Sequence, residues 1–318
     1  MLLPRRPIVR LIGLGNIGFR HLQGLASMAK DIRLEGYDLA HSARERAGLE
    51  WSSYTGSEGD FSQLHDTPAD LAILATSAAG RETMIRQELD RGTRRFLLEK
   101  VVFTQQAAFD RMQAALQAVG ASAYVNTARR LWPLYQKLAQ DTRASGQPVA
   151  LEVSGRHLGL ACNGVHFIDL LQMLSSDMDI TAVDADLSKP WPCKREGYFE
   201  IWGAVRFRTS GGSSLLLSVE EDGPETPLVR LTQGDRHLTI LEGAGQLVDP
   251  AGIVVQDIGR APYQSELSAL YARPMLADMA PMLPSLAEST RAHKALLAVL
   301  EPAFAKAGLM TDQGLPIT

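Results

Sequence analysis

Cysteine is scarce in this sequence, with only Cys162 and Cys193 among its 318 residues. Two cysteines build no disulfide framework, and their spacing matches no zinc site, so we expect neither a disulfide bond nor a bound metal. This scarcity fits a reducing compartment, and we expect a cytoplasmic protein.

A strong excess of either charge is also missing. The 32 basic and 36 acidic residues leave a formal net charge of -4, which argues against nucleic-acid or membrane-surface partners. No stretch approaches the roughly 20 apolar residues of a membrane span. The amino terminus, MLLPRRPIVRLIGLGNIG, carries twin arginines, but its apolar run breaks at Gly13 without a small-residue cleavage site. We interpret it as the first strand of the fold and expect no nucleic-acid and no membrane partner.

Strand-like and helix-like segments alternate through the first part of the chain. Helices are predicted at 18–30, 81–92 and 105–120, and strands at 8–12, 32–38, 70–76, 94–100 and 122–126. Such alternation predicts a parallel sheet covered on both faces. We therefore expect an α/β fold whose residues 1–126 form a Rossmann-type, doubly wound domain.

The pattern changes after residue 126. A helix is predicted at 132–146, a strand at 149–157, a helix at 161–176, and strands at 201–209, 213–221, 227–233, 236–242, 246–249 and 252–256. Residues 265–306 are expected to form helices broken by Pro274, Pro281 and Pro284. Residues 127–318 are thus predicted to be an α+β domain with a large, mostly antiparallel sheet, open on one face. The open face predicts a homodimer or homotetramer.

A glycine motif lies where the first strand gives way to a helix. Gly13, Gly15 and Gly18 form G-x-G-x-x-G, with Asn16 and Ile17 between the last two. The first glycine permits a tight turn, the second lets phosphates approach the backbone, and the third lets helix and strand pack closely. The helix N-terminus then offers free N–H groups to a pyrophosphate. The alternative is a turn that packing alone requires.

An acidic residue stands at the end of the second predicted strand. Asp38 follows Gly18 by 20 residues, the position expected to bind the adenine ribose hydroxyls. Its carboxylate would repel the 2′-phosphate of NADP, so we expect NAD as the cofactor. Arg44 and Arg46 lie close behind and keep NADP compatible with the sequence. The alternative for Asp38 is a solvated turn residue.

Four stretches in order resemble the family of glucose–fructose oxidoreductase, inositol dehydrogenase and rhizopine-catabolism proteins, over nearly the whole length: GLGNIGFRHLQGL, LATSAAGRETMIRQELDRG, FLLEKVV and CNGVHFIDLL. The resemblance implies that Lys100 is the active-site lysine, His166 the catalytic histidine and Asp169 the acid one turn later. It also implies that Thr76, Glu99 and Lys100 contact the cofactor. The chain departs from the family at Val101, where the family has proline, and at Cys162, where it has aspartate.

The chemistry of these positions can also be argued from the residues. Lys100 follows a parallel strand at its carboxyl end, where its ammonium can stabilise a developing alkoxide. A histidine at position 166 suits proton transfer near neutral pH, and Asp169 could orient its ring. The alternatives are an exposed lysine at a strand end and a buried histidine at a helix start.

Five further residues are candidates for the substrate. Arg129 and Arg130 could bind a carboxylate or phosphate, or form an ion pair between the domains. Asn163 could bind a sugar hydroxyl or serve as a helix N-cap. Asn126 and Cys162 complete the set, although Cys162 is better explained as a small buried residue than as a nucleophile.

These features together predict an NAD(P)-dependent oxidoreductase. It would transfer a hydride between the nicotinamide and a hydroxyl carbon of a sugar, cyclitol or sugar derivative, acidic and nucleotide-linked ones included. One alternative is a glycosidase that uses NAD transiently, which would give no net NADH. The other is a non-catalytic dinucleotide sensor, which the missing acid at Cys162 favours.

Overall fold

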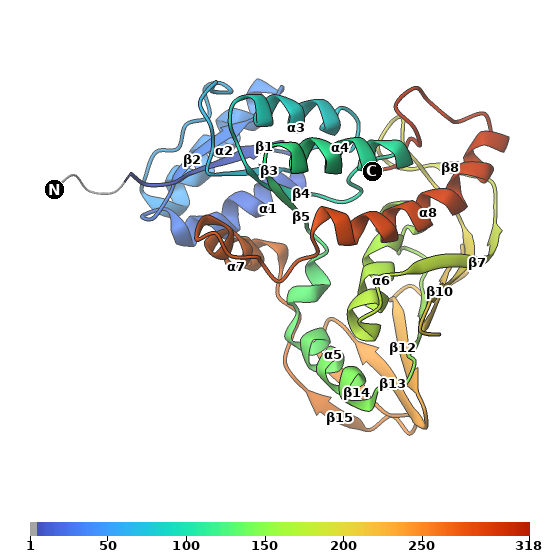
Figure 1. Ribbon diagram of the computed structural model, residues 1–318. Helices are drawn as coiled ribbons and strands as arrows, with labels where there is room; N and C mark the ends of the chain where they lie inside the picture. Colours follow the sequence, from blue (N-terminus) through green and yellow to red (C-terminus); the bar gives the residue numbers. More distant parts are fainter. Residues whose placement is uncertain (1–4) are drawn as a thin grey trace. The chain divides into compact units, whose positions relative to one another are not determined.

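The structure, a computed structural model, describes residues 5–318 and divides into two compact units (Figure 1). The first unit contains the described residues up to Phe103 together with 107–126 and 262–286, and the second contains 104–106, 127–261 and 287–318. The chain thus leaves the first unit after Asn126, where the sequence predicts a boundary. It returns there at 262–286, a segment that the sequence assigns to the second domain.

The first unit is built on a parallel sheet of five strands in the order β2-β1-β3-β4-β5. The strands are β1 (Ile8–Ile12), β2 (Arg33–Tyr37), β3 (Leu71–Leu74), β4 (Arg95–Leu98) and β5 (Ser122–Val125). Every residue of β1 and β3 is buried, as expected for a sheet covered on both faces. The predicted doubly wound parallel sheet is confirmed.

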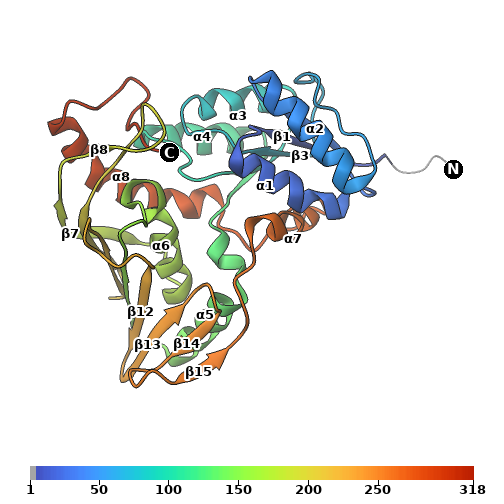
Figure 2. The same ribbon diagram turned by 180° about the vertical axis from the view of Figure 1, so that it is seen from behind.

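Helices cover both faces of this sheet. Helix α1 (Asn16–Leu25) and α2 (His41–Thr55) lie on one face with α7 (Gln264–Leu276) packed along α1, while α3 (Arg81–Asp90) and α4 (Gln106–Ala118) lie on the other (Figure 2). A short 3-10 turn, η1 (Ala26–Met28), follows α1. Helix α2 is missing from the sequence prediction because it buries only Ala47 and Trp51 and so shows no apolar stripe.

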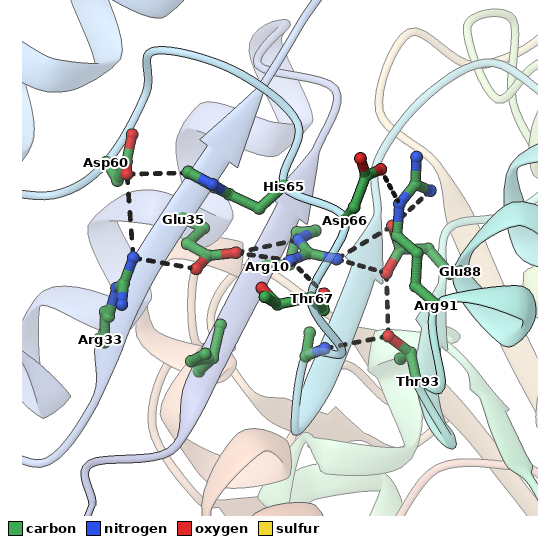
Figure 3. Close-up of polar contacts among 12 residues, drawn as sticks. Arg10, Arg33, Glu35, Asp60, His65, Asp66, Thr67, Glu88, Arg91 and Thr93 are labelled. Atoms are coloured by element: carbon green, nitrogen blue, oxygen red, sulfur yellow. Dashed lines mark hydrogen bonds and ion pairs between the residues drawn. The ribbon is translucent and has the colours of Figure 1, made fainter.

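A network of charged side chains with a buried centre crosses the first unit (Figure 3). Arg10, in the middle of β1 and 1% exposed, pairs with Glu35 of β2 at 2.7 Å and with Glu88 of α3 at 2.9 Å. The charges alternate along the network, in the order Asp60, Arg33, Glu35, Arg10, Glu88, Arg91 and Asp66. Alternation lets the inner charges of Glu35, Arg10 and Glu88 leave water, because each buried carboxylate meets a guanidinium.

The second unit is built on a sheet of eight strands in the order β15-β14-β13-β12-β6-β11-β10-β7. They are β6 (Ala150–Ser154), β7 (Ile180–Leu187), β10 (Gly203–Thr209), β11 (Ser214–Val219), β12 (Leu228–Gln233), β13 (Arg236–Leu241), β14 (Gln246–Val248) and β15 (Val254–Asp257). Only the β6–β11 pair is parallel, so the mostly antiparallel sheet is confirmed. β7 and the small β8 (Trp191–Pro192) and β9 (Phe199–Glu200) pair are not predicted, because β7 buries only Ile180 and shows no alternation.

Helices pack against one face of this second sheet. The helical segments are η2 (Ala128–Leu131), α5 (Pro133–Ser145), α6 (Leu160–Ser175) and α8 (Leu286–Lys306). α6 packs on β11 and β10, and strand residues pointing the other way, such as Glu152, Arg206 and Arg230, are exposed. Among residues 5–318, no helix has the length and apolar character needed to cross a membrane.

Two of the three prolines predicted to break the last helices do so, and the third does not. Pro281 and Pro284 lie in the connection between α7 and α8, as expected, but Pro274 lies inside α7 and does not break it. It stands in the last turn of the helix, where its missing N–H removes one hydrogen bond near an end. The predicted break at Pro274 is therefore wrong.

Candidate functional site

The three glycines in the turn between β1 and α1 are explained in two different ways. Gly13 has a φ of 92°, and a Cβ there would lie 2.8 Å from the backbone of Ala75 and Thr76. A Cβ at Gly18 would lie 1.8 Å from the carbonyl oxygen of Gly13. At Gly15 a Cβ would meet no atom within 4 Å. Packing thus requires the first and third glycines, whereas the second leaves free space in front of the turn.

That space adjoins the start of α1. The helix begins at Asn16 and Ile17, no side chain caps it, and its first turn holds no acidic residue. The first N–H groups of a helix have no partner within the helix, and together with the helix dipole they attract an anion. A dinucleotide pyrophosphate suits both the free space and these donors.

Asp38 lies beside this turn, and its carboxylate accepts hydrogen bonds from the backbone. Its Oδ2 accepts the N–H of Leu14 at 2.8 Å, and its Oδ1 accepts that of Ala40 at 2.9 Å. Each oxygen keeps a further lone pair that could accept from a ribose hydroxyl. Arg46 donates to the carbonyl of Leu14 at 3.1 Å, and Arg44 donates to that of Ser62 at 2.9 Å. The ribose-binding role of Asp38 stays a prediction.

A buried arginine holds the turn that carries Lys100. The Arg81 guanidinium, 1% exposed, donates to the carbonyls of Glu99, Val101 and Val102 after β4, and to that of Thr76 after β3. The Lys100–Val101 peptide bond is cis, and the Lys100 side chain is half-buried. Sequence reasoning missed Arg81, because an arginine at a helix start ordinarily faces solvent.

Glu99 is buried within the first unit, and one of its carboxylate oxygens accepts two hydrogen bonds. Its Oε1 accepts from Nε2 of His21 at 2.7 Å and from Nδ2 of Asn126 at 2.6 Å. Burial by itself raises the pKa of Glu99, but the hydrogen bonds from His21 and Asn126 and the charge of Lys100 hold that pKa below its ordinary value. Asn126, predicted to bind substrate, is 2% exposed and donates to this carboxylate.

The start of α6 carries two candidates from the second unit. A carboxylate distant in sequence caps this helix: Glu200 accepts the N–H groups of Ala161 and Cys162, each at 2.9 Å. Asn163 is not the N-cap, which is Gly159, so that alternative is wrong; its amide donates to the carbonyl of Leu158 at 2.6 Å. Cys162 is half-buried.

Further along α6, Asp169 is held by an arginine. The carboxylate is 1% exposed and accepts three hydrogen bonds from Arg130, at 2.8 to 3.1 Å. His166, one turn earlier on the same helix, is half-buried. The proposed orientation of His166 by Asp169 stays a prediction.

Arg129, like Arg130, is paired with a carboxylate. Its guanidinium donates to Glu242 at 2.6 and 2.9 Å, and the hydroxyl of Tyr135 donates to the same carboxylate at 2.6 Å. It also lies 4.3 Å from the centre of the Phe167 ring. Glu242 and Asp169 both belong to the second unit. The alternative of an ion pair between domains is therefore wrong for both arginines.

The predicted residues fall into two groups, one in each unit. In the first unit Gly18 lies in the first turn of α1, and the others lie just after the carboxyl ends of parallel strands: Gly13, Gly15, Asp38, Thr76, Glu99, Lys100 and Asn126. In the second unit they lie on η2 and α6: Arg129, Arg130, Cys162, Asn163, His166 and Asp169. Within the described part of the chain, no three His, Cys, Asp or Glu side chains gather in a way that could hold a metal ion.

Several solved structures share this fold over almost the whole chain. Scyllo-inositol dehydrogenase from Lactobacillus casei, solved with NAD(H) and scyllo-inositol, is 15% identical with a TM-score of 0.70, and the match covers 95% of this chain and 98% of that one. UDP-N-acetylglucosamine 3-dehydrogenase from Acidithiobacillus ferrooxidans is 16% identical with a TM-score of 0.69, over 93% and 97%. The WlbA dehydrogenase from Bordetella pertussis, solved with NADH and UDP-GlcNAcA, is 17% identical with a TM-score of 0.69, over 94% and 97%.

No family model matches the chain, and no curated protein sequence matches it. Identities this low establish the fold, and at that level the resemblance inferred from the sequence is confirmed. The order of folds along the chain, a parallel sheet with helices followed by a mostly antiparallel sheet, is shared with these dehydrogenases.

Proposed function

We propose that the protein is an NAD(P)-dependent oxidoreductase that transfers a hydride between the nicotinamide and a hydroxyl carbon of a sugar or cyclitol. The observation that carries this proposal is the free space at Gly15, in front of an uncapped helix N-terminus at the carboxyl edge of a parallel sheet. The fold shared with sugar and cyclitol dehydrogenases supports the substrate class.

The proposed cofactor contacts come from the first unit. The glycine turn with Asn16 and Ile17 would hold the pyrophosphate, Asp38 the adenine ribose, and Thr76, Glu99 and Lys100 the nicotinamide half. A bound NAD(P) supplies the hydride acceptor. Asp38 favours NAD over NADP, because its carboxylate repels a 2′-phosphate.

The proposed acid–base chemistry uses Lys100 and His166. Lys100 would hold the substrate oxygen and stabilise the charge that builds on it. His166 would accept the hydroxyl proton, directly or through water, with Asp169 as the acid on the same helix. A group that takes this proton is needed because hydride transfer from an alcohol otherwise leaves a protonated carbonyl.

The pairing of the arginines favours a neutral substrate over an acidic one. Arg129 and Arg130 are the cations predicted to meet a substrate carboxylate or phosphate, yet Glu242 and Asp169 already neutralise them. Opening the Arg130 pair would leave the buried Asp169 carboxylate without its partner, and opening the Arg129 pair would take the guanidinium from the half-buried Glu242. A screen of sugars, cyclitols, sugar acids and nucleotide sugars by NADH absorbance tests this, and net NADH formation also excludes the transient-NAD glycosidase.

The glycine turn allows a test that separates fold from cofactor binding. Gly15→Ala is expected to leave the melting temperature unchanged and to weaken NADH binding about tenfold or more, because its methyl group enters space free of protein atoms. Gly18→Ala is expected to destabilise the fold itself by about 1–3 kcal/mol, because its methyl group overlaps the Gly13 carbonyl. NADH fluorescence and thermal unfolding measure the two effects. Unchanged NADH affinity in Gly15→Ala would contradict the cofactor site.

The cofactor preference depends on Asp38. We expect tighter binding of NADH than of NADPH, and we expect Asp38→Ala to lose that preference, because the variant removes the charge that repels the 2′-phosphate. Titration with both reduced cofactors measures the ratio. Tighter NADPH binding by the unmodified protein would show that the ribose assignment is wrong.

Assembly and location complete the proposal. We propose a homodimer or homotetramer that forms in the cytoplasm through the exposed face of the eight-stranded sheet, where Glu152 lies opposite Arg230 across the strands. Light scattering on the purified protein measures the oligomeric state, and a strictly monomeric protein would contradict the assembly.

A further inference from the structure

A chain of buried polar side chains lies behind Glu99 within the first unit. His21 of α1 contacts Glu99 through Nε2 at 2.7 Å, and its Nδ1 lies 2.6 Å from the hydroxyl of Tyr271 on α7. The hydroxyl of Ser268 lies 2.9 Å from that of Tyr271. His21, Tyr271 and Ser268 have no exposed surface. We call these three residues with Glu99 the His21 chain.

The polar groups of His21, Tyr271 and Ser268 all find a partner when His21 is neutral. The Nε2–H of His21 donates to Glu99, and the Tyr271 hydroxyl donates to Nδ1. The Tyr271 oxygen can then accept from the Ser268 hydroxyl and from the Gln264 amide, the latter at 3.1 Å. This assignment of the tautomer follows from the bonds that each atom can make. The side chain of His21 is thereby held from both sides.

Packing alone does not account for the His21 chain. Buried polar groups weaken a core unless they are satisfied, and apolar side chains of similar size would usually stabilise as well. The chain links three distant segments: the helix that opens at the glycine turn, the residue before Lys100, and the returning segment 262–286. Arg81 already holds the carbonyl side of the Glu99–Lys100 turn, and the His21 chain holds its carboxylate.

We propose that His21 is a positioning residue, which keeps the Glu99 carboxylate fixed and ionised so that the Glu99–Lys100 turn stays in place for the nicotinamide half of the cofactor. This inference rests on the proposed function. His21 touches neither the reacting atoms nor the phosphates; it acts through Glu99.

Two probes separate this role from a general effect on the fold. ADP-ribose contains the pyrophosphate and both riboses but lacks the nicotinamide, whereas NADH contains it. In His21→Leu we expect the Kd of NADH to rise about tenfold, as for a lost bond to a charged group, and that of ADP-ribose to stay within about twofold. His21→Gln, whose amide can still donate to Glu99, is expected to retain most of the NADH affinity.

The pH dependence of NADH binding gives a readout that a purely structural role would not change. The charged or titratable groups facing Glu99 are His21, Lys100, Tyr271 and the guanidinium of Arg81. With His21 present the pKa of Glu99 lies below its ordinary value, so the carboxylate stays ionised until the pH falls through that pKa. Without His21, burial dominates and raises this pKa. The acid loss of NADH affinity should therefore move to higher pH in His21→Leu.

A matched pair of variants controls for the loss of any buried hydroxyl in this unit. Tyr271→Phe removes one hydroxyl from the His21 chain, and Thr93→Val removes one, equally buried, that bonds Glu88. We expect the acid limb of NADH binding to move in Tyr271→Phe and not in Thr93→Val.

Three results would decide against the positioning role. They are equal weakening of ADP-ribose and NADH in His21→Leu, an unmoved acid limb in both His21→Leu and Tyr271→Phe, or Tyr271→Phe behaving as Thr93→Val. If the unmodified protein binds neither ADP-ribose nor NADH, the proposed function fails instead.

Discussion

Replacing Lys100 with alanine is expected to lower turnover by about 10²–10⁴-fold, and to weaken NADH binding by about tenfold at most. The ammonium group is the proposed partner of the substrate oxygen, so its loss removes stabilisation that matters most as charge builds. The glycine turn and Asp38, which would hold most of the cofactor, keep their contacts in the variant. Steady-state rates on the substrate found by screening, with NADH titration alongside, measure the two effects.

Lys30 offers the control, because it is an exposed lysine in the same unit. Lys30→Ala should keep full turnover, and full turnover in Lys100→Ala would contradict the assignment. The turnover of His166→Ala is expected to fall by the same order of magnitude as that of Lys100→Ala. If instead it keeps its rate and pH profile while Lys100→Ala is inactive, His166 is structural and Lys100 handles the proton.

The largest expected effect on stability comes from Arg10. Arg10→Met should lower the free energy of unfolding by about 3–5 kcal/mol, because it leaves the Glu35 and Glu88 carboxylates buried without the guanidinium between them. Denaturant unfolding followed by circular dichroism measures the change. The glycine turn is not touched, so NADH affinity of the folded fraction should stay the same.

The neighbouring Arg33 provides a matched comparison. It pairs with the same Glu35 at 3.4 Å, but its side chain is 52% exposed. Arg33→Met should therefore lower stability by about 1 kcal/mol or less. Adding Glu35→Gln and Glu88→Gln to Arg10→Met should recover part of the loss, since the uncompensated charges are then gone. A loss in Arg33→Met as large as in Arg10→Met would contradict the burial argument.

In the first unit, the elements that depend on local sequence could be predicted. The β1 strand is recognisable from its apolar run in spite of Arg10, and the glycine motif follows it directly. Gly92, Gly120 and Gly146 end their helices with positive φ, as their place in the sequence indicates. The grouping of the candidate residues in this unit could also be predicted, because residues that follow parallel strands all lie at one edge of the sheet.

Contacts between distant residues could not be predicted. Nothing near Glu200 in the sequence marks it as the cap of α6, 38 residues away from its Cys162 contact. The bond between His21 and Tyr271 spans 250 residues. Arg81 resembles an ordinary surface arginine until the carbonyls around it are seen. Such partners depend on tertiary packing, and hydrophobic periodicity and local motifs give no information about it.

The return of α7 to the first unit affects how this protein can be made. α7 packs along α1, where a Cβ at Gly24 would lie 2.7 Å from the Ser268 side chain. Domains usually fold in order as the ribosome releases them. Here the face of α1 that carries His21 and Gly24 stays open until residues 264–276 have been synthesised. A nascent or truncated chain that ends earlier would present this face to chaperones and proteases, so the amino-terminal unit matures only after α7 has left the ribosome.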